Sequence, residues 1–277
     1  MNRIQSVFSR LKSQNRAALI PFITAGDPDA TTTVALMHRL TQAGVDLIEL
    51  GVPFSDPMAD GPTIQRSSER ALKHHISLKD VFSIVAEFRK TDQSTPVVLM
   101  GYANPIEAMS YKDFVQAASH AGVDGVLVVD YPPEECAEWV RYLKKQNIDP
   151  IFLLSPTTPE SRIRQVAELA SGYVYYVSLK VVTGASHLDL HEVGDKLSQL
   201  RSYISVPIGV GFGIRDEQTA QRIAEQADAV VIGSRIVEEI ERSPAADLLA
   251  NVGALVESLR RAIDAKSDHS SVTENDV

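Results

Sequence analysis

The chain has 277 residues, of which 44% are hydrophobic and 23% are charged, and its formal net charge is −9. This composition is typical of a globular protein with a full core, and the acidic balance without a basic stripe argues against a nucleic-acid-binding protein. The single cysteine, Cys136, excludes a disulfide framework and an all-cysteine metal site and fits a reducing compartment. We predict a structural role for it, because no paired histidine that could activate the thiol is evident.

The N-terminal segment, residues 1–16, is basic, rich in serine and free of acidic residues. Such a segment is also typical of an organellar transit peptide. However, Ile4, Val7, Phe8 and Leu11 follow the spacing of one face of a helix. We therefore predict an amphipathic helix that covers one end of the fold. No apolar run approaches the length of a membrane-spanning helix.

Eight short apolar runs recur along the chain, and each ends in turn-forming residues. Their cores are apolar at nearly every position, which is typical of strands buried on both faces of a parallel sheet. They span residues 18–26, 47–54, 96–105, 125–133, 149–156, 173–179, 207–214 and 229–237. The segments between them have the pattern of amphipathic helices; two of these, residues 28–44 and 110–122, end in glycine, and Asp216 is the predicted N-cap of a third.

Strands and helices that alternate eight times predict an α/β fold, a single (β/α)8 TIM barrel with an extra N-terminal helix. A doubly wound open sheet is the alternative, although it usually has fewer strands and a reversal point. Because no linker or shift in composition interrupts the pattern, residues 1–265 are predicted to form one domain. Residues 266–277 are polar and lack an apolar period, so we predict a disordered tail.

Two carboxylates lie where a barrel places its catalytic groups, at the C-terminal ends of strands and in the loops that follow. Glu49 lies near the end of the second strand and is either held by a structural partner or kept for proton transfer, since burial raises the pKa of a carboxyl. Asp60 and Asp56 lie in the next loop. Asp-Gly-Pro is ordinary turn chemistry, but from this loop a carboxylate can reach the barrel mouth.

Glycines follow the last three strands, at Gly184, at Gly209 to Gly213, and at Gly233 beside Ser234. Glycines after the late strands, with a short helix next, make a phosphate site in many barrels; tight turns alone are the alternative. Apolar side chains near strand ends are either core or the wall of a site for a flat apolar group. They are Phe22, Met100, Tyr102, Leu127, Phe152, Tyr175 and Phe212. No metal-ligand spacing is evident, and the adjacent His74 and His75 are predicted to lie on the surface.

The runs PFITAGDP, DLIELGVPFSDPMADGPTIQRSSERAL, MGYANP, VTGA, GFGI and IGS, in this order, resemble the tryptophan synthase alpha subunit family. The resemblance covers about residues 1–265, and the second block is highly specific. It implies a cytoplasmic lyase of tryptophan biosynthesis that cleaves indole-3-glycerol phosphate to indole and glyceraldehyde 3-phosphate by acid–base retro-aldol chemistry.

The resemblance also implies residue roles. Glu49 would be the main proton shuttle, Asp60 would bind the indole N–H and stabilise the developing positive charge, and Tyr175 would lie near Glu49. Amides around Gly184, Gly213, Gly233 and Ser234 would hold the phosphate. The indole pocket would be formed by Phe22, Met100, Tyr102, Leu127 and Phe212, with Thr183 on a loop that closes toward Asp60. That loop departs from the family, which usually has glycine where Val181 stands, so its closed conformation is expected to be harder to reach.

The family works as an α2β2 complex whose beta subunit carries pyridoxal phosphate and receives indole through a tunnel. This chain has no lysine motif for that cofactor, so none is assigned to it and no metal is expected. The contact surface would include residues 53–60 and the loop around Asn104 and Pro105. Two other functions remain open: another phosphate-binding barrel enzyme, such as a sugar-phosphate isomerase, and a non-catalytic or weakly active partner that activates a beta subunit.

Overall fold

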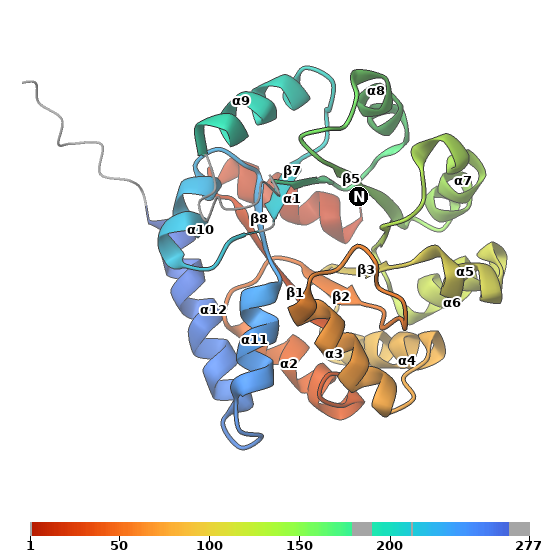
Figure 1. The fold of residues 1–277 in the computed structure, drawn as a ribbon, viewed down its shortest axis with the longest axis vertical. Helices are drawn as coiled ribbons and strands as arrows, with labels where there is room; N and C mark the ends of the chain where they lie inside the picture. The colour runs from red at the N-terminus through yellow and green to blue at the C-terminus, as the bar shows by residue number, and fades with distance from the viewer. Residues whose placement is uncertain (1, 179–189, 212, 266–277) are drawn as a thin grey trace, which may run out of the picture.

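The computed structural model describes residues 2–178, 190–211 and 213–265. Within them, eight parallel strands form a closed barrel in which every strand pairs with its neighbours in chain order, and β1 pairs with β8 to complete the ring (Figure 1). The strands are β1 (Ala18–Thr24), β2 (Ile48–Gly51), β3 (Val97–Gly101), β4 (Gly125–Val128), β5 (Asp149–Leu154), β6 (Val174–Val177), β7 (Ile208–Gly211) and β8 (Ala229–Ile232). This topology confirms the predicted TIM barrel and excludes the open sheet.

The helices surround the barrel (Figure 1). They are α1 (Arg3–Ser13), α2 (Ala30–Gln42), α3 (Pro62–Lys73), α4 (Leu78–Arg89), α5 (Ala103–Met109), α6 (Tyr111–Ala121), the short 3₁₀ helix η1 (Pro133–Glu135), α7 (Ala137–Lys145), α8 (Glu160–Leu169), α9 (Leu190–Arg201), α10 (Glu217–Ala224), α11 (Ser234–Arg242) and α12 (Leu248–Asp264). Local signals set several ends. Asp216 caps α10 by accepting from the amide of Thr219, as predicted, and Gly122 ends α6 in a left-handed conformation that suits glycine.

Apolar side chains form two cores, one on each face of the closed sheet. Strand residues that face outward, such as Ile23 and Leu50, pack against the surrounding helices. Residues that face inward, such as Ile20, Val98 and Val231, fill the barrel. Because strand side chains alternate between the two faces and both faces are covered, the strands have the nearly continuous apolar sequences from which they were predicted.

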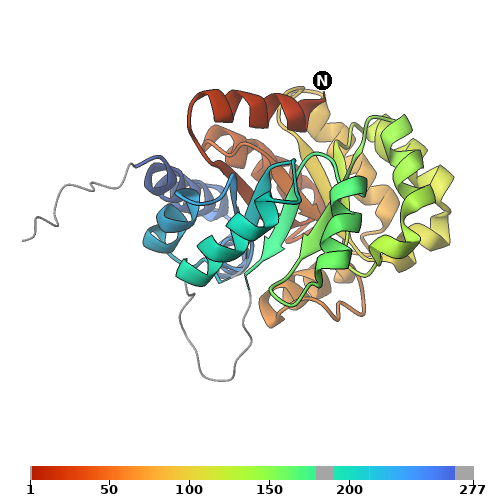
Figure 2. The same ribbon diagram turned by 90° about the horizontal axis from the view of Figure 1, so that it is seen from above.

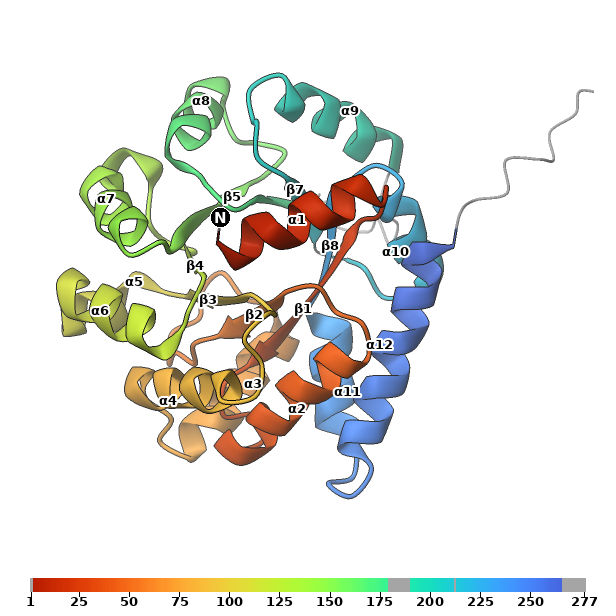
Figure 3. The same cartoon turned by 180° about the vertical axis from the view of Figure 1, so that it is seen from behind.

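Helix α1 closes one end of the barrel (Figures 2 and 3). Its four predicted apolar residues, Ile4, Val7, Phe8 and Leu11, are buried and belong to the core inside the barrel. Polar contacts tie the helix to residues at the N-terminal ends of strands: Arg3 pairs with Asp124 before β4, and Asn2 donates to Asp149 in β5. The helix therefore seals the N-terminal end of the barrel, which leaves the opposite end open for a site.

Several smaller predictions can be compared with the structure. The Cys136 thiol is buried and donates to the carbonyl of Pro132, and burial raises its pKa to about 11, in line with a structural role. His74 and His75 are exposed. In the described part of the chain, no helix is both long and apolar enough to cross a membrane. The predicted tail, residues 266–277, lies outside the described residues, and the single-domain boundary at residue 265 stays a prediction.

Candidate active site

A cavity of about 280 Å³ opens among residues that end the strands and begin the loops after them. It brings together eight of the residues predicted from the sequence: Phe22, Glu49, Asp60, Met100, Tyr175, Gly213, Gly233 and Ser234. These residues come from six strands or their loops, so only barrel closure places them around one space. The C-terminal end of the strands, where barrel enzymes carry their chemistry, is therefore also where this cavity lies.

Glu49 lies on β2, beside Phe22 of β1 in the strand register, and its side chain is completely buried. The hydroxyl of Tyr173 donates to its Oε1 at 2.5 Å, whereas its Oε2 has no hydrogen-bond partner among the described residues. Burial raises the pKa of Glu49 to about 7, against a smaller lowering by the Tyr173 bond. Glu49 thus has a structural partner on one oxygen, and its pKa suits proton transfer near neutral pH.

The raised pKa of Glu49 predicts a pH-dependent penalty on folding. In the unfolded chain its pKa returns to about 4.5, so the folded state holds the proton more tightly between pH 4.5 and 7. The buried carboxyl therefore lowers the free energy of unfolding by nothing below the pKa of Glu49 in the unfolded chain. The loss grows as pH rises and is complete above about pH 7, where it amounts to roughly 3 kcal/mol. Glu49→Gln should stabilise the chain against urea at pH 8 but hardly at pH 4.5.

The matched control for this measurement is Glu225→Gln, which alters an exposed carboxylate. Its effect on the free energy of unfolding should be small at both pH values. A Glu49→Gln effect that is the same at pH 4.5 and pH 8 would contradict a charge that is buried at neutral pH.

Asp60 is held by hydrogen bonds to its side chain and its backbone. Tyr102 donates to its Oδ2 at 2.9 Å, and the amide of Ala59 donates to the same tyrosine oxygen at 3.0 Å. The side-chain amide of Gln65 on α3 donates to the Asp60 carbonyl at 2.8 Å. Burial raises the pKa of Asp60, partly offset by the Tyr102 bond. By contrast, Asp56 in the same loop is exposed and does not line the cavity.

Tyr175 lies close enough to both carboxylates to feel their charge. Burial raises the pKa of its hydroxyl well above the usual value, and the negative charges of Glu49 and Asp60 raise it further. The hydroxyl therefore stays protonated and can act as a donor. Gly211 on β7 makes room for this ring, because a Cβ atom there would lie only 2.1 Å from the Tyr175 oxygen.

The predicted phosphate end is formed by the loops after β7 and β8. Gly213 has a φ of +77°, which favours glycine, and Gly233 precedes the first residue of α11, Ser234. No described side chain caps that helix N-terminus, and free amides at such an end suit an anion. Arg215 lines the same cavity and has no ion-pair partner among the described residues. The other predicted residues of this region, Gly184, Thr183 and Phe212, as well as Val181, lie outside the described residues.

The apolar wall of the cavity contains Phe22 and Met100 as predicted. Further apolar lining residues are Ile64, Val129, Leu153, Val177, Ile214 and Val231. Tyr102 does not line the cavity itself but reaches Asp60 with its hydroxyl while its ring stacks on Phe54. Leu127 is fully buried in the core inside the barrel and does not line the cavity.

Sequence reasoning missed Tyr173, which binds Glu49, and three polar residues that line the cavity, Thr63, Arg215 and Glu238. A signal for Tyr173 was present, because residues two apart in a strand point to the same face and Tyr175 was already a candidate. For Arg215, the only signal was a cation directly after the glycine-rich run of the seventh strand. Among the described residues, no cluster of His, Cys, Asp or Glu is placed to hold a metal ion.

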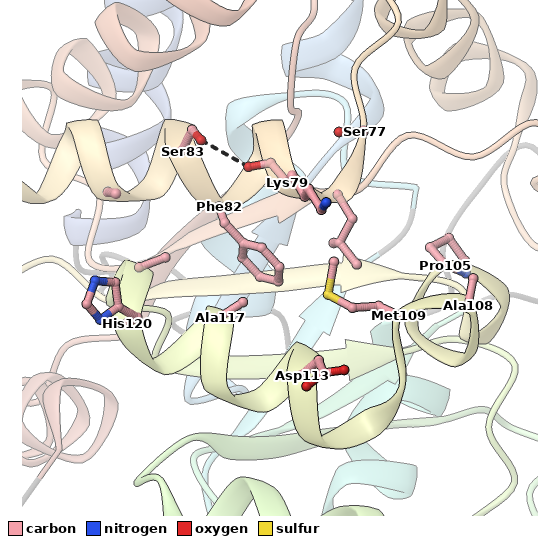
Figure 4. A pocket seen from close by; sticks show the side chains of 13 residues that line it. Ser77, Lys79, Phe82, Ser83, Pro105, Ala108, Met109, Asp113, Ala117 and His120 are labelled. Atoms are coloured by element: carbon pink, nitrogen blue, oxygen red, sulfur yellow. Dashed lines mark hydrogen bonds between the residues drawn. The ribbon is translucent and has the colours of Figure 1, made fainter.

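A larger groove, of about 1060 Å³, lies on the outside of the barrel between α4 and α6. Figure 4 shows Phe82 of α4 and Met109 of α5 extending into it, with Ala117 of α6 opposite. None of the candidate catalytic or phosphate residues lines this groove. Size alone therefore does not mark the active site, and the smaller cavity, which contains the buried Glu49 and the half-buried Asp60, is the better candidate.

Residues 8–264 match the family model described as tryptophan synthase alpha chain. The chain belongs to the tryptophan synthase alpha chain family. It is thus a lyase of tryptophan biosynthesis that acts on indole-3-glycerol phosphate. The family assignment fits the two carboxylates and the phosphate-type loops that share one cavity.

Curated relatives and solved structures agree with this family. The tryptophan synthase alpha chain of Nitrosomonas europaea is 94% identical over 99% of this chain and 100% of that protein, and the one from Nitrosospira multiformis is 69% identical over 96% of each. The crystal structure of the alpha subunit from Legionella pneumophila is 46% identical, has a TM-score of 0.89, and covers 95% of this chain and 99% of that one.

Proposed function

We propose that this chain cleaves indole-3-glycerol phosphate in the cavity at the C-terminal end of the barrel, with Glu49 as the group that moves protons. The observation that carries this assignment is the state of Glu49. It is fully buried, its pKa is about 7, and its Oε2 has no protein partner among the described residues. Such a carboxyl can both give and accept a proton at neutral pH.

In the proposed reaction, protonated Glu49 delivers its proton to C3 of the indole ring. The ring then carries a positive charge that can accept the electron pair of the C3–C1′ bond. The resulting Glu49 carboxylate removes the proton from the glycerol hydroxyl next to that bond. The bond breaks, its electrons return to the ring to give indole, and the hydroxyl oxygen becomes the aldehyde oxygen of glyceraldehyde 3-phosphate. Glu49 is again protonated, so the cycle balances.

Asp60 is proposed to bind the indole N–H and to stabilise the positive ring. The hydrogen bond from Tyr102 fixes one of its oxygens, and its position in the cavity wall supports this role. The two carboxyls can perform different tasks because their partners differ. Tyr175 is proposed as a positioning donor near Glu49, since its raised pKa keeps the hydroxyl protonated.

The phosphate group and the indole ring of the substrate are assigned to the glycine-containing loops and to the apolar wall of the cavity. Backbone amides around Gly213, Gly233 and Ser234 are proposed to hold the phosphate, with Gly184 completing the site and Arg215 adding a cation in a chain of net charge −9. Phe22 and Met100 are proposed to contact the indole ring, and Thr183 to join when its loop closes. Leu127 would then support that wall from behind, and Phe212 would flank it.

The family implies a beta subunit as partner, and we propose an α2β2 complex in the cytoplasm in which indole passes to that subunit. The proposed contact surface contains residues 53–60 and the segment around Asn104 and Pro105. In this part of the molecule the apolar side chain of Met58 is 85% exposed. An exposed apolar side chain of this size supports a surface that a partner covers. Pyridoxal phosphate is assigned to the beta subunit, and no cofactor is assigned to this chain.

The test is indole release from indole-3-glycerol phosphate by the purified chain, with and without a beta subunit. We expect indole to form slowly with the chain alone and faster with the partner. If no indole forms in either case while the chain still stimulates the beta reaction, the chain is an activator and the catalytic proposal fails. Turnover of sugar phosphates in place of this substrate would point to a different barrel enzyme.

A further inference from the structure

A carboxylate on α11 joins two arginines of α3. Arg66 donates to both oxygens of Glu241, at 2.8 and 2.7 Å, and Arg70 donates to Oε1 at 2.7 Å. The two helices lie side by side outside the barrel (Figure 1). Paired, forked contacts of this kind fix geometry as well as charge, which a single exposed ion pair does not do.

The same Arg70 also connects α3 to the loop after β1. Its Nε and Nη2 atoms donate to the two oxygens of Asp27, at 2.7 and 2.8 Å. Only 1% of the Asp27 side chain is exposed, so this carboxylate depends on its partner. A second contact, between Thr24 of β1 and Ser67 of α3 at 2.6 Å, anchors the helix to the same strand. Helix α3 is therefore fixed to the barrel on one side and to α11 on the other.

These two helices begin at opposite ends of the proposed substrate. Helix α3 starts directly after Asp60, and Gln65 in its first turns binds the Asp60 carbonyl. Helix α11 starts at Ser234 in the proposed phosphate end. Between them, Thr63 donates to Glu238 at 3.4 Å, a weaker contact than those of Glu241. The position of α3 against α11 therefore determines how far the indole end lies from the phosphate end.

We propose that Glu241 and Arg70 are positioning residues that set the spacing between the Asp60 end and the phosphate end of the cavity. They act through the two helices and do not line the cavity. Their effect falls on a ligand that spans both ends, because only such a ligand needs the correct distance between them. A small misplacement far from the reacting atoms is enough to lower the rate substantially. This inference rests on the proposed placement of indole and phosphate.

The test variant is Glu241→Ala, which removes the ion pairs of Arg66 and Arg70 with α11 and leaves the Asp27 side chain in place as a partner for Arg70. The matched control is Glu239→Ala, which removes a carboxylate of the same helix that pairs with Arg235 within α11. In the complex with a beta subunit, one measures kcat and KM for indole-3-glycerol phosphate and the inhibition constants of indole and of glycerol 3-phosphate. The urea midpoint of each variant is recorded as well.

We expect Glu241→Ala to lower kcat/KM for the whole substrate about tenfold. The inhibition constants of the two small ligands should stay within about twofold of the unchanged chain, and Glu239→Ala should behave like the unchanged chain. The inference is overturned if the small ligands weaken as much as the whole substrate, if Glu239→Ala gives the same loss, or if Glu241→Ala has no effect. An unchanged chain that releases no indole would instead contradict the proposed function.

Discussion

Replacing Glu49 with glutamine is expected to lower the rate of indole formation about a thousandfold, the range of a lost general acid–base group. Glutamine has nearly the same shape and can still accept the Tyr173 hydrogen bond at its amide oxygen. It cannot give a proton to indole C3 or remove one from the glycerol hydroxyl. The expected loss is therefore in kcat, and KM should change little. Steady-state indole release with the beta subunit present measures both.

Tyr173→Phe is the companion variant, because it keeps the carboxyl and removes only its hydrogen-bond donor. Since that donor lowers the pKa of Glu49, its loss should raise this pKa and move the pH profile of kcat toward higher pH, with a smaller loss of rate than in Glu49→Gln.

If Glu49→Gln retained more than a tenth of the activity, another group would have to carry the protons, and the assignment of Glu49 would be wrong.

Asp60→Asn is expected to lower kcat/KM about a hundredfold, the effect of removing one group that stabilises charge in the transition state. The change keeps the size of the side chain and a hydrogen-bonding oxygen for Tyr102. It removes the negative charge that we propose stabilises the protonated indole ring. Because the positive charge on the ring develops only during the reaction, Asp60→Asn should weaken binding of the neutral inhibitor indole much less than it lowers turnover. Indole release and inhibition by indole, both in the isolated chain, give the two numbers.

Asp56→Asn is the matched control, since Asp56 lies in the same loop, is exposed, and does not line the cavity. In the isolated chain its activity should stay within about twofold of the unchanged protein. Equal losses in the two variants would mean that the overall charge of the loop, and not the position of Asp60, controls the rate.

The barrel was predictable because its signals are local. Strands with both faces covered need apolar residues at nearly every position, so each of the eight runs identified one strand, although the runs extended into the loops after them. The run at residues 96–105, for example, contains β3 and also the first residues of α5. Helix α1 was predictable because its signal is also local. One face of the helix packs against the barrel interior, so its apolar residues recur at helical spacing, at Ile4, Val7, Phe8 and Leu11.

The site was predictable only as a set of residue types near strand ends. Glu49 and Asp60 stood out because a carboxylate in an apolar strand, or in a loop at the active end, calls for an explanation. The sequence determined which residues lie at that end of the barrel. It did not determine that Tyr173 holds Oε1 of Glu49 and leaves Oε2 without a partner, because that contact joins residues 124 positions apart.

The sequence by itself thus determined the strand order, the helix that seals the barrel, and the positions at which chemistry can occur. The tertiary structure decided which of those positions share a cavity: it placed Phe22 and Met100 in the wall, and it left Leu127 in the core. It alone revealed that Glu241 joins α3 to α11. The physical reason is the distance along the sequence over which each effect acts. The periodicity of apolar residues and the preferences of turn residues act over a few residues, whereas burial, pKa and ion pairing depend on groups that only the closed barrel brings together.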